Sequence, residues 1–151
     1  AIRNGFEHVG ELTGLHGRWE VFSDKPLVIL DTGHNPGGLA YNMRQLKSMK
    51  AGNIRIIIGM VSDKDINAAL GLMPKEAIYY FTKASVKRAM DEQALHSLAA
   101  KHGLSGRHYP NVAEAYEAAM KDCTGDDIIY IGGSNFIVGD FLAYCQQEEQ
   151  K

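Results

Sequence analysis

Strand-length apolar runs, separated by segments with helical spacing, constrain the fold of this chain more than any other feature. Four of them occupy residues 27–30, 54–60, 77–82 and 127–131. They consist mostly of isoleucine, leucine, valine and aromatic residues, which is typical of strands that are covered on both faces. Strands that alternate with helices predict βαβ units with right-handed crossovers, and therefore a mainly parallel sheet.

Capping residues mark where the intervening helices begin. The five expected helices start near Asn35, Asp63 or Asp65, Asp91, Asn111 and the Gly132-Gly133 turn. The first should run over residues 36–49, with Pro36 at its first position, and the third should end at Gly103. Weaker strands are expected at 19–22 and 107–109. We therefore predict an α/β fold with a mainly parallel, Rossmann-like sheet of about five to six strands and helices on both faces.

Length and charge restrict the classes of partner. A chain of 151 residues is expected to form one domain, which we divide into a linker segment at 1–24, an α/β domain at 25–146 and a tail at 147–151. The net charge of −2 argues against nucleic acid and membrane partners, because both require a basic face. No apolar run could span a bilayer. We expect a cytoplasmic monomer with two reduced cysteines and no metal site of its own.

Three loops follow the carboxyl ends of predicted strands, the edge at which such sheets bind ligands. They cover residues 31–36, 60–65 and 132–135. In the first, Asp31 ends a buried strand and His34 precedes a helix N-terminus, where backbone N–H groups favour anions. A histidine there can donate to phosphate or carboxylate oxygens. An equally good explanation is that Asp31 and Asn35 only cap the turn and the helix.

Four further side chains are candidates for binding anions. Lys64 could pair with a carboxylate or phosphate, although a solvated lysine explains it as well. Ser134 follows two glycines in a loop that resembles an anion nest, although it could simply be a helix N-cap. Arg18 could clamp a phosphate, and Arg88 belongs to a basic cluster that could contact an anionic substrate; solvated charge is the alternative for both. The chain has neither a P-loop motif nor GxGxxG.

Four short motifs occur in a fixed order along the chain. They are GRWE at 17–20, DTGHNP at 31–36, DKD at 63–65 and GGS at 132–134. Together they resemble the C-terminal domain of folylpolyglutamate synthase/dihydrofolate synthase, in the Mur ligase superfamily, over nearly the whole chain. The GRxE and DxxHNP pair is specific, and the other two motifs add support by their order. The family usually reads DGAHNP; Thr32 and Gly33 depart from it, but both are small enough to preserve the turn.

The resemblance implies an ATP-dependent ligase of folate biosynthesis and one-carbon metabolism. Such enzymes join a carboxylate of a folate or of dihydropteroate to the amine of L-glutamate through an acyl phosphate. In the family, the arginine of GRxE contacts ATP phosphate and the aspartate of DxxHNP contacts the ribose, which correspond to Arg18 and Asp31. The histidine of that motif, here His34, lies near the phosphates and the incoming glutamate and is the candidate catalytic residue. Lys64 and Ser134 correspond to residues on the amino-acid side.

Family members carry the P-loop, the Mg²⁺ ligands and most folate contacts in a larger N-terminal domain. None of these features of the N-terminal domain is found in this chain, which also does not begin with methionine. We therefore expect ATP to be bound jointly with that domain of the parent chain, Mg²⁺ to be held mainly by it, and this chain to be inactive alone. One alternative is a stand-alone α/β module that binds a nucleotide or amino acid without catalysis. Another is a ligase of cell-wall synthesis, which usually has a lysine-containing motif in place of residues 34–36.

Overall fold

The computed structural model describes residues 20–24, 26–31, 36–49, 52–61 and 66–149. Strands and helices alternate along these residues, as predicted. The elements are β1 (Glu20–Asp24), β2 (Leu27–Leu30), α2 (Pro36–Ser48), β3 (Ile54–Ile58), α3 (Ile66–Gly71), β4 (Ile78–Phe81), α4 (Glu92–Lys101), β5 (Gly106–His108), α5 (Val112–Asp122), β6 (Ile128–Gly132) and α6 (Asn135–Glu149).

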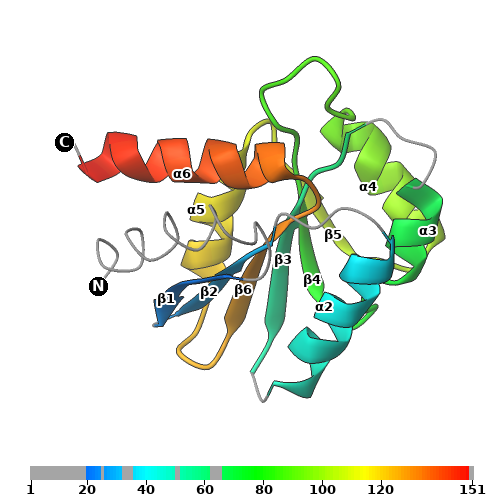
Figure 1. Cartoon of the computed structure of the whole chain (residues 1–151), viewed down its shortest axis with the longest axis horizontal. Helices are drawn as coiled ribbons and strands as arrows, with labels where there is room; N and C mark the ends of the chain where they lie inside the picture. The colour runs from blue at the N-terminus through cyan, green and yellow to red at the C-terminus, as the bar shows by residue number, and fades with distance from the viewer. Residues whose placement is uncertain (1–19, 25, 32–35, 50–51, 62–65, 150–151) are drawn as a thin grey trace.

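The six strands form one sheet in the order β1-β2-β6-β3-β4-β5. Strands β2, β6, β3, β4 and β5 are parallel, and β1 pairs with β2 in the antiparallel direction. The sheet is therefore mainly parallel and falls within the predicted number of strands. Its last strand in sequence, β6, lies between β2 and β3, so the connection through α5 returns across the sheet to its centre (Figure 1).

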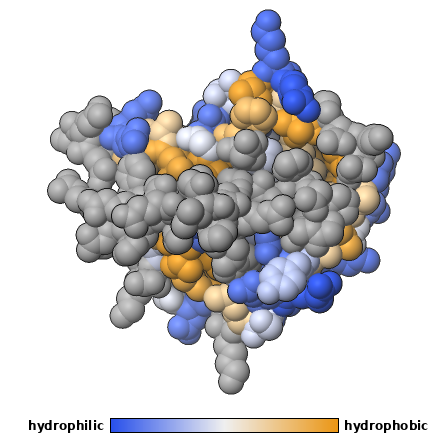
Figure 2. Space-filling view, in the orientation of Figure 1, coloured by the Kyte–Doolittle hydropathy of each residue, from blue (hydrophilic) through white to orange (hydrophobic). Residues whose placement is uncertain are grey.

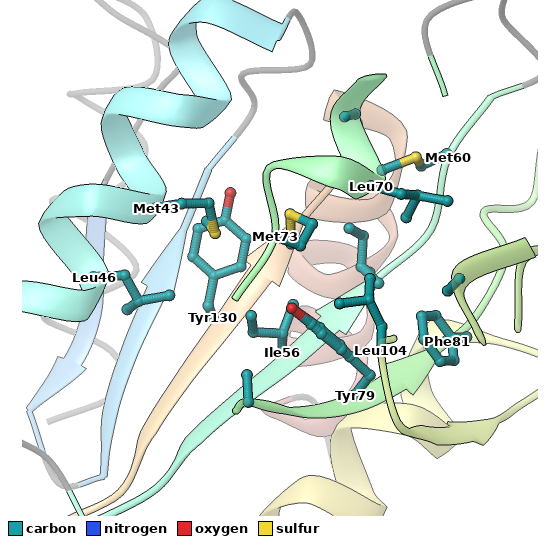
Figure 3. Packing of buried hydrophobic residues seen from close by; sticks show 14 of the residues in the cluster. Met43, Leu46, Ile56, Met60, Leu70, Met73, Tyr79, Phe81, Leu104 and Tyr130 are labelled. Carbon is teal, nitrogen blue, oxygen red and sulfur yellow. The ribbon is translucent and has the colours of Figure 1, made fainter. Parts of the chain in front are cut away.

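Helices cover both faces of the sheet, and each face has its own apolar core. Helices α2, α3 and α4 pack on one face, where Met43, Ile56, Tyr79 and other apolar side chains meet (Figure 3). Helices α5 and α6 pack on the other, around Phe141. Strands β2, β3, β4 and β6 contribute alternate residues to the two cores, which explains why these four strands read as continuous apolar runs.

The first helix shows how the sequence pattern orients an element. Met43 and Leu46 of α2 are buried in the core, whereas Arg44 and Lys47 on the opposite side are exposed. Figure 2 shows the resulting hydrophilic outer surface of α2. This separation of apolar and charged side chains at helical spacing fixes which face of α2 lies against the sheet.

Two predicted helix caps are present with their hydrogen bonds. The carboxylate of Asp91 accepts from the backbone N–H groups of Gln93 and Ala94 at the start of α4. Asn111 Oδ1 accepts from the backbone N–H of Glu114 at 2.9 Å, and its amide donates to the Glu114 carboxylate at 3.1 Å. Gly103 follows α4 with a φ of 81°, as expected for a glycine after a helix end. The second of the predicted helices, α3, ends at Gly71.

A buried ion pair joins the amino-terminal side of the central strands. Arg55 of β3 donates from Nε to Asp127 at 2.8 Å, directly before β6, and from Nη1 to the Tyr80 hydroxyl at 3.0 Å. Asp127 also accepts from the backbone N–H groups of Asn53 and Thr124. This network ties β3, β4 and β6 together at the end of the sheet opposite the carboxyl edge.

Candidate functional site

Four strand ends approach closely at the carboxyl edge of the sheet, where the sequence places its polar loops. The backbone N–H of Asp31, after β2, donates to the carbonyl of Ile131 in β6 at 3.0 Å. The N–H of Gly59, after β3, donates to the carbonyl of Gly132 at 3.3 Å. Thr82, after β4, donates from its N–H to the carbonyl of Ile58 at 2.9 Å. The strand ends that carry the predicted loops therefore lie side by side.

Glycines make this close approach possible. A Cβ atom on Gly132 would lie 2.8 Å from the carbonyl oxygen of Asp31, and one on Gly59 would lie 2.7 Å from that of Thr82. Gly133 has a φ of 101°, and a Cβ atom there would lie 2.3 Å from the carbonyl oxygen of Gly59. A larger residue at any of these positions would force the strand ends apart. The glycines of the GGS motif therefore have a packing role at this edge.

The chain leaves the neighbouring strands β2 and β6 toward opposite faces of the sheet. Helix α2 follows β2 on one face, and α6 follows β6 on the other (Figure 1). Ligands of open α/β sheets bind where adjacent connections diverge in this way. The predicted location of the site, beyond the ends of β2 and β6, therefore coincides with the topological switch point of the sheet.

Asp31 lies at this switch point and is completely buried. Its Oδ2 atom accepts a hydrogen bond from the Asn42 amide of α2 at 2.8 Å and a short one from the Tyr130 hydroxyl of β6. Burial and the adjacent charge of Asp31 raise the pKa of Tyr130 well above its ordinary value, so its hydroxyl stays protonated and donates. Sequence reasoning missed both donors; the signal was a tyrosine in a buried strand, whose hydroxyl needs a partner.

Ser134 has the local role that the sequence allowed. It is buried, and its Oγ atom accepts from the backbone N–H of Ile137 at 3.3 Å in the first turn of α6. This contact confirms the N-cap interpretation. A contact between Ser134 and an amino-acid substrate stays a prediction.

Arg88 is exposed in the loop between β4 and α4. That loop is held on one side by the Ser85 backbone N–H and hydroxyl, which donate to Asp140 of α6 at 2.8 and 3.0 Å. On the other side Met90 N–H donates to the Met60 carbonyl at 2.7 Å. Exposure of Arg88 agrees with a solvated charge, and its contact with substrate stays a prediction. The other candidates, Arg18, His34 and Lys64, lie outside the described residues.

Glu92 is a charged residue near this edge that sequence reasoning did not single out. It lies in the first turn of α4, two residues after Met90, and is 9% exposed. Its Oε1 atom is buried and has no hydrogen-bond partner within the described parts of the chain. A buried carboxylate oxygen without a partner costs stability.

Metal ligands do not gather at this edge in the described residues. No three histidine, cysteine, aspartate or glutamate side chains lie together there or elsewhere in those ranges. His96 and His108 approach with their Nδ1 atoms 3.0 Å apart, but they belong to α4 and to the edge strand β5. The two cysteines, Cys123 and Cys145, form no disulfide, as expected. None of the helices described could cross a membrane.

Comparison with known proteins places the whole motif series in one family. Residues 17–135 match the model described as Mur ligase, glutamate ligase domain, a span that begins at GRWE and ends just beyond GGS. The dihydrofolate synthase/folylpolyglutamate synthase of Escherichia coli (strain K12) is 32% identical over 123 residues, which are 80% of this chain and 28% of that protein.

Solved structures of such enzymes share the fold. E. coli FolC in complex with DHPP and ADP superimposes with a TM-score of 0.80 at 28% identity, covering 89% of this chain and 32% of that one. A bifunctional folylpolyglutamate synthase/dihydrofolate synthase with Mn, AMPPNP and L-glutamate bound gives a TM-score of 0.76 at 31% identity, covering 87% and 32%. The chain therefore spans about a third or less of the length of these relatives.

Proposed function

The chain belongs to the Mur ligase family as a glutamate ligase domain, and we propose that it is the C-terminal domain of an ATP-dependent ligase that adds L-glutamate to a folate. The observation that carries the proposal is the order and position of the motifs. DTGHNP and GGS follow the adjacent strands β2 and β6 at the topological switch point, and the family match runs from GRWE to GGS. Relatives with this domain were crystallised with ADP, AMPPNP and L-glutamate.

The reaction has two steps that require different contacts. ATP first phosphorylates a carboxylate of the folate, or of dihydropteroate, and ADP leaves. The amine of L-glutamate then attacks the acyl phosphate, an amide forms and phosphate leaves. Charge develops on phosphate oxygens in both steps, so the catalyst needs positive charge and oriented donors around them. Arg18 and His34 supply these in our proposal, and Asp31 accepts hydrogen bonds from the ATP ribose.

The glutamate substrate presents two carboxylates and one amine. We assign Lys64, Ser134 and Arg88 to the carboxylates, assisted by the N-terminus of α6. Mg²⁺ requires several oxygen ligands, and the described residues do not provide a cluster of them. As the family resemblance implies, we assign the metal, the P-loop and most folate contacts to an N-terminal domain of the same polypeptide, acting as a monomer in the cytoplasm. No observation favours the stand-alone module or the cell-wall ligase.

The test is an assay of ATP-dependent addition of labelled glutamate to a reduced folate. It uses the polypeptide that carries this chain together with its P-loop domain. Arg18→Ala and His34→Ala should each lower the rate about 100-fold or more, because each removes a donor aimed at developing charge. Lys101→Ala, at the exposed end of α4, is the matched control and should leave the rate unchanged. Rates within a few-fold of the parent for both site variants would remove the proposed mechanism.

A further inference from the structure

We infer that Tyr130 and Asn42 are positioning residues that fix the orientation of the Asp31 carboxylate for the nucleotide ribose. The inference rests on the proposed function, in which Asp31 contacts the ribose. It adds two residues from outside the four motifs, one in the middle of β6 and one on α2.

The geometry restrains the carboxylate at three points. The backbone of Asp31 is held by its N–H bond to Ile131, 3.0 Å in length, in register with the pairing of β2 and β6. Its Oδ2 atom is held by the hydroxyl of Tyr130 and by the amide of Asn42 at 2.8 Å. Rotation about either side-chain bond of Asp31 would break these contacts. The direction of the second carboxylate oxygen is therefore defined by residues of β6 and α2.

The chemistry of the donors suits this role. A phenol and an amide are both neutral, so they hold the carboxylate without cancelling its charge. A charged carboxylate accepts stronger hydrogen bonds from ligand hydroxyl groups than a neutral acceptor does. If the only purpose were to join β2, β6 and α2, a neutral side chain would do so at a lower desolvation cost.

All three residues of this cluster are buried. Tyr130 is fully buried and Asn42 is 5% exposed. The ring of Tyr130 packs beside Met43 in the core under α2 (Figure 3). The role inferred for both residues is to hold Asp31, to whose Oδ2 atom they donate. Asp31 is also buried here, so nucleotide binding must uncover one edge of the carboxylate while the two donors hold Oδ2.

The experiment is a cycle between protein and nucleotide variants in the full-length ligase. We compare ATP with 2′-deoxy-ATP and 3′-deoxy-ATP in the parent protein, Tyr130→Phe and Asn42→Ala. Each variant should lower kcat/KM for ATP about tenfold, mainly through KM, because a hydrogen bond to a charged group is lost. With the deoxynucleotide that lacks the hydroxyl bound by Asp31, the loss should shrink to less than about twofold, because the contact being positioned is already absent.

Tyr79→Phe is the matched control. It also removes a buried tyrosine hydroxyl, which donates to the Pro74 carbonyl at 2.6 Å, away from Asp31. Its effect should be the same with all three nucleotides. Equal losses with ATP and both deoxynucleotides for Tyr130→Phe, or for Asn42→Ala if the first variant does not fold, would overturn the inference. The proposed function would be contradicted by a different result, namely that the full-length protein adds no glutamate to folate.

Discussion

Replacing Asp127 by asparagine should destabilise the chain more than any surface substitution. The variant has nearly the same shape but loses the charge that pairs with Arg55. The carboxylate of Asp127 is fully buried and accepts from Arg55 Nε at 2.8 Å and from the backbone N–H groups of Asn53 and Thr124 at 3.0 and 3.1 Å. An asparagine would also direct N–H groups at some of these donors, and the Arg55 guanidinium would stay buried without its partner.

The expected cost follows from these contacts. Breaking a buried ion pair by removing one partner costs about 3–5 kcal/mol. At about 2–4 °C per kcal/mol for a domain of this size, the melting temperature should fall by roughly 6–20 °C. With an m-value near 2 kcal/mol/M, the urea midpoint should fall by roughly 1.5–2.5 M. These shifts are large enough to measure in the 151-residue chain by urea titration followed by circular dichroism.

The pH dependence supplies a second readout. Burial alone would raise the pKa of Asp127, but hydrogen bonds from Thr124 and Arg55 outweigh it and lower the pKa below its ordinary value of 3.8. The folded state therefore binds the proton less tightly than the unfolded state. The stability that Asp127 contributes is present above about pH 4 and is lost as pH falls through the lower, folded-state pKa. Asp127→Asn should remove this part of the acid dependence.

Asp126→Asn is the matched control, because Asp126 is the exposed neighbour of Asp127. Its urea midpoint should equal that of the parent chain. A second variant, Arg55→Met with Asp127→Leu, removes both charges and should recover part of the loss. A free energy of unfolding for Asp127→Asn within about 1 kcal/mol of the parent value would be too small a loss for a buried ion pair. It would show that this network does not hold the central strands together.

Three further substitutions test local features. Gly133→Ala should lower the free energy of unfolding by about 1–3 kcal/mol, because Gly133 has a φ of 101° and the new Cβ would lie 2.3 Å from the Gly59 carbonyl oxygen. Gly125 has open space around it, so Gly125→Ala is the control and should leave the melting temperature unchanged. Glu92→Leu should raise the free energy of unfolding by about 0.5–2 kcal/mol in urea titration, because it removes a buried oxygen that has no hydrogen-bond partner in the described residues. This gain outweighs the loss of a negative charge from the N-terminus of α4. Asn111→Ala should lower stability by about 1 kcal/mol in a thermal melt, through loss of the α5 cap.

The local features of this fold were predictable because they depend on neighbours in sequence. Residues 27–30 and 127–131 read as strands because both faces are covered, and Asp91 and Asn111 cap helices through bonds to residues two or three positions away. The antiparallel pairing of β1 and the central place of β6 depend on contacts between distant segments. Neither follows from spacing along the chain.

The same distinction between local and long-range contacts applies to the candidate site. The sequence predicted that Asp31 and Ser134 would lie at a common edge, because parallel strands end together. It left open whether Ser134 caps a helix, which the bond from Ile137 confirms. It could not predict that Tyr130 and Asn42 converge on Asp31, because that convergence requires the crossing of α2 over β6.

The most direct test of this account measures amide formation between glutamate and folate together with ADP release. The two proteins compared are the full-length polypeptide and the 151-residue chain alone. We predict that the full-length protein forms one ADP for each amide bond and that the isolated chain forms neither product. Amide formation by the isolated chain, or none by the full-length protein with ATP, glutamate and a reduced folate, would contradict the assignment of this domain as one half of a ligase site.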